Sequence, residues 1–515
     1  MPKHRPLMRD LVIGIDSSTS ATKAIAWDQQ GRMVAEGRAP IAMSNPHPGW
    51  FEQDPAEWWG STVTALRQVT GLVDAARIAA IGISNQRETF SVFTEDGTSL
   101  RPGTVWLDER ARAQQKRFGE KFGATRVHQI SGKPLDITPC LYRMIWLREV
   151  EPTVLDRGQR IAEVHGYLTF KLTGEWATSL ASADPMGVLD MEHRTWSKEI
   201  LEAAGIDPAM MLRLVAPGAQ SGAVTTAVAA QTGLKAGTPV IAGGGDGQCA
   251  GTGAGVSADH PGRAYVNLGT ALVSGSYGRD YAHHPAFRTE IAVADQGYIF
   301  ETCLRTGTFL VDWLTREMLR AEAGKQKEFI ATLEAEAATS PIGAHGVVVV
   351  PYWQGCMTPH WDSSARGVIA GLSGSTRRGD IYRAFLESIA LEQATSAVNV
   401  EKSTGSEIDH YVAIGGGAAS ELWVQILADA TGRAVRRSET VEASSLGAAI
   451  AAAKGAGWTR TMAEATEAMA GRPTRTFEPD PKCNARYAEL RAIHADLWPK
   501  IAEWNTRLVD FAEQV

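Results

Sequence analysis

The sequence predicts an α/β fold made of two similarly organised halves, and three observations point to it. Short apolar segments that are typical of strands alternate with longer segments of helical periodicity. A strand, a small polar turn and a second strand are predicted at 11–28 and again at 263–278. The chain has 515 residues, which is more than a single hydrophobic core usually organises. These observations together predict a duplicated architecture, with low sequence identity between its halves.

The first half is predicted to begin with hairpins and to continue as alternating helix and strand. Residues 11–40 contain apolar segments separated by SSTSATK and QQGR, which are turn-forming sequences. A helix is expected from Asp54, because Asp54 can cap it and Pro55 suits its first position. Glu57 stands three residues after this cap, the spacing of a capping box. Residues 77–86, RIAAIGISNQ, then predict another buried strand.

The second half repeats this order of elements. Its first hairpin is followed by further hairpin-like sequence and then by helices. Residues 411–432 predict a strand, a glycine turn and a helix, and the alanine-rich segment 442–457 predicts another helix. No low-complexity linker separates the halves, so we place a soft boundary at 254–261 and predict domains at 1–255 and 256–515.

Composition is that of an ordinary globular protein, with 44% apolar and 21% charged residues. The longest strongly apolar runs, such as 346–351, have the length of strands rather than of membrane spans. The apolar segment at 11–16 is too short for the core of a signal peptide and no small-residue cleavage site follows, so we expect no secretion. A formal net charge of −7 without a basic stripe argues against a nucleic-acid partner.

The five cysteines are widely spaced and form no C-x-x-C pair. An odd number at such spacing matches neither a disulfide framework nor a zinc site. The sequence therefore favours a reducing compartment, and we expect a cytoplasmic protein.

The turn after the first strand has the composition of a phosphate site. Asp16 ends this strand and Lys23 precedes the next one. Between them, Ser18 and Thr19 lie among small residues that let a ligand approach the backbone closely. Phosphoryl transfer needs backbone donors, a cation and a carboxylate for the metal ion, and this turn has all three. An ordinary serine-rich hairpin explains the same residues equally well when they are considered alone.

A second strand ends in a glycine-rich loop that carries one acid. Residues 240–248 read VIAGGGDGQ, a buried strand followed by three glycines and Asp246. In open α/β sheets, ligands lie beyond the carboxyl ends of strands, where an acid can accept the proton of an attacking hydroxyl. The alternative is a plain loop with a solvated aspartate. Because three glycines before a single acid are unusual for such a loop, we favour the functional interpretation.

The hairpin of the second half has a similar small turn. Its residues Gly269 and Thr270 can offer an N–H and a hydroxyl to phosphate oxygens. This motif is a weak signal by itself.

A glycine turn, GGGAAS at 415–420, joins a predicted strand to a predicted helix near Leu422. Such a turn suits a nucleotide that rests against a helix N-terminus. It lacks the G-x-G-x-x-G spacing of dinucleotide-binding folds, and the chain has no G-x-x-x-x-G-K-[ST] phosphate loop. A tight turn into a helix explains these residues equally well when they are considered alone.

Polar residues also follow the predicted strand at 77–86. Arg87 and Glu88 could hydrogen-bond the hydroxyls of a polyol, one as donor and the other as acceptor, with Trp106 and Asp108 as an apolar wall and a further acceptor. The alternative is a surface ion pair of little energetic value. Consecutive strand residues point to opposite sides, so we predict that the strand breaks at Gln86 or Arg87 and that at least one side chain of the pair points at Asp246.

The order of these segments resembles that of the FGGY family of carbohydrate kinases, within the hexokinase–actin–Hsp70 ATPase superfamily. The resemblance runs from about Leu11 to about Gly457. IDSSTSATKAIAWD is similar to the family's first phosphate hairpin, and GGGDGQ to the loop of its catalytic base. WLREVEP and YLTFKLTG resemble its N-terminal domain, and TPHWDSSARGVIAGL with DIYRAFLESIALE resembles its second signature. GGGAASELWVQILADATG and EASSLGAAIAAA are similar to its adenosine-side region.

This resemblance implies two actin-like (ribonuclease H-like) ATPase domains with a cleft between them. It also implies ATP and Mg²⁺ as cofactors, a small sugar or polyol as substrate, Asp246 as general base, and Asp16 with Asp246 at the metal. The implied substrate-binding residues are Gln86, Arg87, Glu88, Trp106 and Asp246. The implied ATP-binding residues are Asp16, Ser18, Thr19, Lys23, Gly269, Thr270, Gly307, Gly416, Gly417, Ala418 and Ser420. Members are often dimeric, so a homodimer is one expectation, although the sequence does not determine the oligomeric state.

The substrate is open between two branches of the family. Xylulokinases usually carry a Met-His pair where Arg87 and Glu88 stand, and the Arg-Glu pair resembles glycerol kinases. Glycerol kinases, however, have a substrate-facing tyrosine where Thr138 aligns, and Arg143 replaces a usual lysine. We therefore expect a pentulose such as xylulose, with glycerol or another linear polyol (a tetritol or pentitol) as the alternative. The sequence does not identify the hydroxyl that is phosphorylated.

Two hypotheses of other classes fit less well. A non-enzymatic actin-like or chaperone-type ATPase module needs no sugar pocket, so Asp246 and the polar segment 85–88 argue against it. A sugar-binding regulator without catalysis does not require Asp16, Lys23 and Asp246 together with both small phosphate-type turns.

Overall fold

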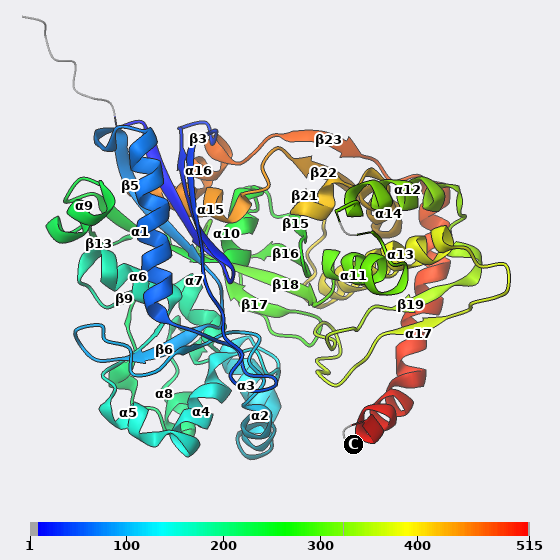
Figure 1. The fold of residues 1–515 in the computed structure, drawn as a ribbon, viewed down its shortest axis with the longest axis horizontal. Helices are drawn as coiled ribbons and strands as arrows, with labels where there is room; N and C mark the ends of the chain where they lie inside the picture. The colour runs from blue at the N-terminus through cyan, green and yellow to red at the C-terminus, as the bar shows by residue number, and fades with distance from the viewer. Residues whose placement is uncertain (1–8, 323, 513–515) are drawn as a thin grey trace, which may run out of the picture.

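The computed structural model describes residues 9–322 and 324–512. They form two domains of mixed α/β structure that lie side by side, as the sequence predicts (Figure 1). In these described ranges, no helix combines the length and the apolar character needed to cross a membrane. The N-terminal residues MPKHRPLM, which contributed to the expectation that the protein is not secreted, lie outside the described residues.

The first domain is built on a six-stranded sheet. Its strands, in spatial order, are β13 (Gln220–Ala223), β14 (Pro239–Gly245), β5 (Ile78–Asn85), β1 (Leu11–Ser17), β2 (Ala21–Trp27) and β3 (Met33–Pro40). β2 pairs antiparallel with both β1 and β3, which confirms the predicted hairpins. β5 runs parallel to β1 and β14 runs parallel to β5, whereas β13 pairs antiparallel with β14 at the edge.

The second domain repeats this topology on a seven-stranded sheet. Its strands, in spatial order, are β17 (Arg288–Ile291), β18 (Tyr298–Leu304), β16 (Leu272–Gly278), β15 (Arg263–Leu268), β21 (His410–Ile414), β22 (Ala434–Ser438) and β23 (Pro473–Phe477). β15, β16 and β18 correspond to β1, β2 and β3, and β21, β22 and β23 to β5, β14 and β13, including the antiparallel last strand. The duplication that the sequence predicts is therefore present in the strand topology.

Ten helices of the described first part accompany the first sheet and its insertions. They are α1 (Pro55–Leu72), α2 (Arg112–Phe118), α3 (Ala124–Ser131), α4 (Cys140–Val150), α5 (Pro152–Arg157), α6 (Val164–Thr173), α7 (Leu180–Ala183), α8 (Lys198–Ala204), α9 (Thr226–Thr232) and α10 (Asp246–Gly253). α1 begins where predicted: Asp54 accepts a hydrogen bond from the Ala56 N–H at 2.9 Å, and Pro55 is the first helical residue.

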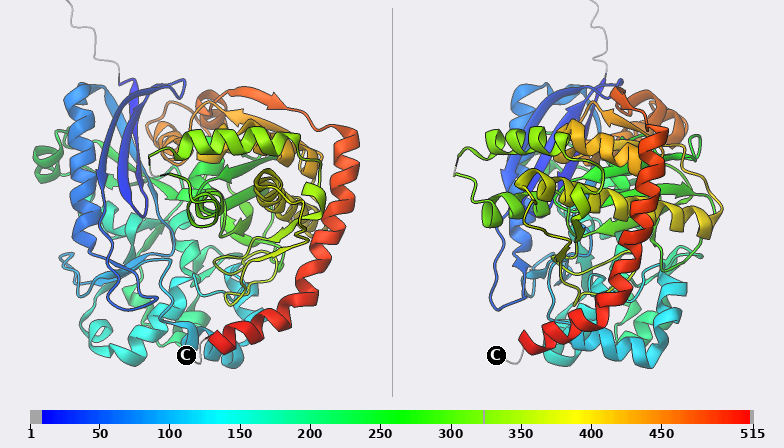
Figure 2. Two further views of the ribbon diagram at one scale, coloured as in Figure 1. Left: turned by 45° about the vertical axis from the view of Figure 1, so that its right-hand side comes forward. Right: turned by 90° about the vertical axis from the view of Figure 1, so that its right-hand side faces the viewer.

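The helices of the second half cover the second sheet and its outer side. They are α11 (Thr308–Trp313), α12 (Gln326–Thr339), α13 (Arg378–Thr404), α14 (Glu421–Thr431), α15 (Ala443–Gly455), α16 (Met462–Met469) and α17 (Pro481–Ala512). α17 runs down the outer side of the second domain and bends in its lower part (Figure 2). Pro499 lies inside this helix, and proline kinks helices because it lacks a backbone N–H.

Short strands complete the structure outside the two main sheets. β4 (Glu52–Gln53), β7 (Gly103–Thr104), β6 (Phe90–Phe93) and β8 (Arg160–Glu163) form a four-stranded sheet. The remaining pairs are β10 (Leu189–Asp190) with β11 (Thr195–Trp196), β12 (Arg213–Val215) with β9 (Ala177–Ser179), and β19 (Val348–Val350) with β20 (Val368–Ala370).

Two helices from different halves cross between the sheets. α15, from the second half, packs on β1 and β5 of the first sheet and on α10. Glycine makes these crossings possible: a Cβ on Gly447 would lie 1.9 Å from the Cys249 carbonyl oxygen, and one on Gly14 would lie 1.9 Å from that of Ser445. The Ser445 hydroxyl donates to the Gly14 carbonyl at 2.9 Å across the same contact. The two domains are therefore joined by a closely packed inner core, and not by a loose linker.

Candidate active site

The two predicted phosphate turns occupy equivalent places in the two sheets, after β1 and after β15. The Ser18 hydroxyl donates to the Ala21 carbonyl at 2.8 Å and closes the first turn. The second turn supports the loop before α11, because the Gly307 N–H donates to the Thr270 carbonyl at 2.8 Å. A Cβ at Gly307 would lie 2.4 Å from the Gly269 carbonyl oxygen, so this close approach requires glycine. Gly269, Thr270 and Gly307 are thus brought together, as predicted.

The glycine turn between β21 and α14 lies against the end of β15. Gly415 has a φ of +82°, and a Cβ there would lie 2.3 Å from the Asn267 side-chain oxygen. Gly416 is exposed and has open space around its Cβ position, whereas Gly417 and Ala418 are buried. The turn therefore leaves open backbone beside the second phosphate turn.

Ser420, another predicted nucleotide residue, caps α14. Its hydroxyl accepts a hydrogen bond from the Trp423 N–H at 3.1 Å. This contact makes Ser420 a residue that positions the helix next to the glycine turn.

Asp16 is buried at the end of β1, directly opposite Lys23 in the β1–β2 ladder. It accepts a hydrogen bond from the Ser84 hydroxyl at 3.1 Å. Burial, reinforced by the nearby charge of Asp246, raises the pKa of Asp16 to about 7. The Lys23 ammonium lies 2.5 Å from Glu442, the residue immediately before α15. Lys23 therefore connects the first phosphate turn to the second domain.

Asp246, the predicted base, is the first residue of α10 and follows β14 directly. Its Oδ1 accepts the Gly247 N–H at 2.8 Å and lies 3.1 Å from Arg87 Nε. The side chain is 41% exposed, so a ligand can reach it. Burial of its surroundings raises the pKa of Asp246, and the positive charge of Arg87 works in the opposite direction. Arg87 thus favours the carboxylate form that a general base needs.

Arg87 and Glu88 stand where β5 has ended. The last strand residue is Asn85 and Glu88 has a φ of +50°, so the chain turns as the alternation argument predicts. Arg87 points at Asp246 and also lies 2.9 Å from Glu301, while Glu88 pairs with Arg288 at 2.8 Å. Because these side chains are only 8% and 7% exposed, the alternative of a surface ion pair is wrong.

Gln86 and Trp106 connect this segment to the first phosphate turn. Gln86 donates to the Gln53 side-chain carbonyl at 2.9 Å, and Trp106 Nε1 donates to the Thr19 hydroxyl at 3.0 Å. Trp106 therefore lies beside the phosphate turn.

Asp108 does not act as the free acceptor that the sequence suggested. It is fully buried, pairs with Arg110 at 2.7 Å and accepts the Phe51 N–H at 2.7 Å. These contacts use its oxygens for local structure.

The second domain contributes charged residues to this site that the sequence reasoning missed. Glu301 on β18 binds Arg87 and accepts the Tyr265 hydroxyl at 3.1 Å. Arg288 and Glu290 stand at alternate positions of β17, next to it in the sheet. The sequence did hold a signal for them, because Arg288 and Glu290 are charged residues at alternate positions of one strand.

Lys133 and Asp184 extend this network within the first domain. Lys133 lies 3.1 Å from Glu290 and 3.4 Å from Asp184. Burial raises the pKa of Glu290, but Lys133 and Arg288 more than offset this and lower it to about 2. Burial raises the pKa of Asp184 well above its usual range. The network thus places donors and acceptors from both domains around Asp246, an arrangement suited to a ligand with several hydroxyls.

Two carboxylates at this site, those of Asp16 and Asp246, are of the kind that binds a divalent cation. Asp16 and Asp246 are close enough for the charge of one to raise the pKa of the other. Within the described ranges, no group of three or more His, Cys, Asp or Glu side chains is arranged to hold a metal ion. Mg²⁺ in phosphoryl-transfer sites uses one or two carboxylates, with phosphate oxygens and water as its other ligands. The donor set therefore fits Mg²⁺ delivered with a nucleotide.

Comparison with known proteins agrees with this arrangement. The model of the FGGY family of carbohydrate kinases, N-terminal domain, matches residues 11–253, and that of the C-terminal domain matches residues 264–456. Xylulose kinase from Bacillus subtilis is 30% identical over 506 residues, which cover 97% of this chain and 99% of the relative. Glycerol kinase from Symbiobacterium thermophilum is 29% identical over 474 residues, which cover 89% and 92%. The crystal structure of xylulose kinase from Rhodospirillum rubrum has a TM-score of 0.88 and 26% identity, with 96% and 99% covered.

Proposed function

Because this chain belongs to the FGGY family of carbohydrate kinases, we propose that it transfers the γ-phosphoryl group of ATP to a hydroxyl of a pentulose such as xylulose. The chain is accordingly a sugar kinase. One observation supports the proposed chemistry: Asp246, directly after β14, lies 3.1 Å from Arg87, which in turn lies 2.9 Å from Glu301 of the second domain. The full-length similarity to xylulose kinases supports the choice of a pentulose.

Asp246 would accept the proton of the substrate hydroxyl as that oxygen attacks the γ-phosphorus. Arg87 holds the carboxylate in place at 3.1 Å and favours its charged form. Glu88, Arg288 and Glu301 would bind the other hydroxyls, as acceptors and donors that are already held in fixed positions by one another.

ATP would lie across the two turns that follow β1 and β15. Thr19, Gly269 and Thr270 would offer hydroxyl and backbone donors to the phosphates. Ser18, whose hydroxyl and N–H both donate to the Ala21 carbonyl, would hold the first turn in shape. The open backbone at Gly416 would lie beside the nucleoside. Mg²⁺, held by Asp16 and Asp246, would neutralise charge that develops on the transferred phosphoryl group.

Three further points belong to the same proposal. The domains are 1–255 and 256–515, and α15 of the second domain packs on the sheet of the first. The enzyme works in the cytoplasm, and its five cysteines, none of which is disulfide-bonded in the described structure, are consistent with a reducing compartment. A homodimer is proposed from the family resemblance alone, and sedimentation of the purified chain tests it.

A linear polyol is the second candidate substrate. The Arg87–Glu88 pair resembles glycerol kinases, and one full-length relative is named as a glycerol kinase. An ADP-release assay with xylulose, ribulose, glycerol, erythritol and xylitol separates the two. We expect the highest kcat/KM with a pentulose, and ADP release at least ~10²-fold slower with Asp246→Asn. Highest kcat/KM with glycerol would favour the alternative, and no ADP release with any ketose or polyol would contradict both.

A further inference from the structure

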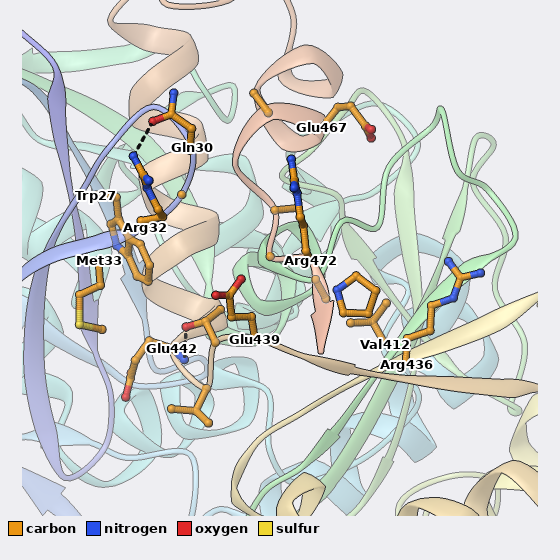
Figure 3. A pocket seen from close by; sticks show the side chains of 18 of the residues that line it. Trp27, Gln30, Arg32, Met33, Val412, Arg436, Glu439, Glu442, Glu467 and Arg472 are labelled. Carbon is orange, nitrogen blue, oxygen red and sulfur yellow. Dashed lines mark hydrogen bonds between the residues drawn. The ribbon is translucent and has the colours of Figure 1, made fainter. Parts of the chain in front are cut away.

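A cavity lies between the two domains, apart from the candidate active site (Figure 3). Its volume is about 900 Å³, within the usual size of small-molecule sites. The β2–β3 turn bounds it on one side, and the starts of β15 and β21 with the segment 439–442 bound it on the other. The two phosphate turns lie at the opposite ends of β2 and β15. None of the residues assigned above to ATP, the metal or the sugar lines this cavity.

The wall formed by the second sheet is basic. The ladders pair Arg263 with His410 and Val412 with Arg436, so these side chains share one face of β15, β21 and β22. Among the described residues, no carboxylate oxygen lies within 4.0 Å of the side-chain nitrogens of Arg263 or Arg436. Arg263 Nε and His410 Nε2 are buried without a hydrogen-bond partner in the described structure. This wall therefore carries the positive charges of Arg263 and Arg436, whereas burial lowers the pKa of His410 to about 4 and keeps its ring neutral.

Further cations and acceptors complete the cavity. Arg472 and Arg32 of the β2–β3 turn also line the cavity (Figure 3). Glu439 supplies an acceptor between them, while Glu442 is engaged by Lys23 at 2.5 Å and Glu467 by His260 at 3.1 Å. A ligand that complements both walls carries an anionic group at one end and hydroxyls at the other.

We propose that this cavity binds a phosphorylated polyhydroxyl compound, with its phosphate at Arg263 and Arg436 and its hydroxyls directed to Glu439. A guanidinium presents donors in a fixed fork that matches phosphate oxygens, and carboxylates accept from hydroxyls. The site goes beyond the proposed kinase reaction, because it uses none of the residues of that reaction.

The cavity is connected to the active site through Glu442. This residue lines the cavity, pairs with Lys23 beside Asp16, and immediately precedes α15. Two residues later, the Ser444 hydroxyl donates to the Asp246 backbone carbonyl at 3.0 Å. An occupant of the cavity therefore contacts the segment that supports both Asp246 and Lys23, and the site is a regulatory one.

Calorimetry on the full chain tests the site with ribose 5-phosphate, inorganic phosphate and ribose as probes. We expect ribose 5-phosphate to bind, and Arg436→Gln to weaken its binding at least about tenfold through the loss of a bidentate contact. The matched control is Arg475→Gln on the next strand. Arg475 lies on the opposite face, is exposed and pairs with Glu421, so its variant should bind within about twofold of wild type.

Hydrogen exchange tests the connection without any need for a known substrate. Ribose 5-phosphate should slow exchange of the amides at 439–446 in wild type and Arg475→Gln, but not in Arg436→Gln. The proposal is overturned if wild type does not bind ribose 5-phosphate, or if both variants bind equally. It is also overturned if inorganic phosphate or ribose binds as tightly as ribose 5-phosphate, or if binding leaves exchange at 439–446 unchanged.

Discussion

The guanidinium of Arg87 lies 3.1 Å from the carboxylate of Asp246, and its other end lies 2.9 Å from Glu301 in the second domain. One side chain thus joins the proposed base to the opposite wall of the cleft. Because buried charges must be paired, this contact holds Asp246 and the second domain in a defined relation.

Replacement of the base tests the proposed chemistry directly. Asp246→Asn should lower kcat by ~10²-fold or more, the usual worth of general-base catalysis, and should leave the fold and ATP binding intact. Steady-state kinetics, with nucleotide binding measured by calorimetry, checks this. Turnover within a few-fold of wild type would remove Asp246 from the mechanism.

Asp16 should act on the metal–nucleotide side of the reaction. Asp16→Ala removes a carboxylate at the end of β1, next to the first phosphate turn, so Mg·ATP-dependent turnover should fall much more than sugar binding. Titration with Mg²⁺ at fixed ATP, beside calorimetry with the sugar alone, separates the two effects. Lost sugar binding with normal Mg·ATP turnover would contradict the assignment.

Glu88 should contribute to substrate affinity. Glu88→Ala removes a buried acceptor held by Arg288, and the apparent affinity for the sugar should weaken by ~1–3 kcal/mol. The matched control is Glu387→Ala, which breaks another buried pair, with Arg383, in the second domain. The control should lower the melting temperature and leave the apparent affinity unchanged. Unchanged affinity of Glu88→Ala across the whole sugar panel would refute the role of Glu88.

The crossing of α10 and α15 should tolerate no side chain at Gly447. Gly447→Ala places a Cβ 1.9 Å from the Cys249 carbonyl oxygen, a backbone atom, and overpacking of this kind costs about 1–3 kcal/mol or more. Gly60→Ala is the matched control, because Gly60 is also inside a helix and has nothing within 4 Å of its Cβ position. Thermal melting should show a lower free energy of unfolding for Gly447→Ala. For Gly60→Ala, the free energy of unfolding should rise by up to ~1 kcal/mol. Equal melting temperatures would contradict the packing.

Stability should fall below neutral pH partly because of His165. Burial lowers the pKa of His165 to about 3, so the unfolded chain binds a proton near pH 6.5 while the folded chain does not. Stability is therefore lost as pH falls from 6.5 towards 3, by about 1.4 kcal/mol for each pH unit. The melting temperature of His165→Gln should consequently decline less between pH 7.5 and pH 5.5 than that of wild type.

The control for this prediction is His193→Gln. His193 is 72% exposed, and the hydrogen bond that its ring donates to the Asp190 carboxylate raises the pKa of His193, which favours the folded chain at lower pH. His193→Gln should therefore leave the decline of the melting temperature between pH 7.5 and pH 5.5 unchanged or make it slightly steeper. A decline that is equally reduced in both variants would show that burial of His165 is not its cause.

The sequence by itself determined the alternation of strand and helix, the duplicated hairpins, and which acids and glycines stand at the ends of single strands. Those features depend on residues that are neighbours in the chain: apolar runs, glycine turns, and an acid such as Asp16 or Asp246 placed directly after a strand. The break after Asn85 was predictable for the same reason, since alternation along a strand is a local property.

Tertiary structure alone decided which residues meet across the cleft. Glu301 binds Arg87 and Glu442 binds Lys23 because strands and helices that are distant in the sequence pack together between the domains. Asp108 shows the converse, since a residue suggested as a ligand acceptor is occupied by Arg110. The cavity lined by Arg263 and Arg436 also exists only because the β2–β3 turn faces the second sheet. Periodicity places each side chain on one face of its own element, whereas the packing of separate elements selects its partner.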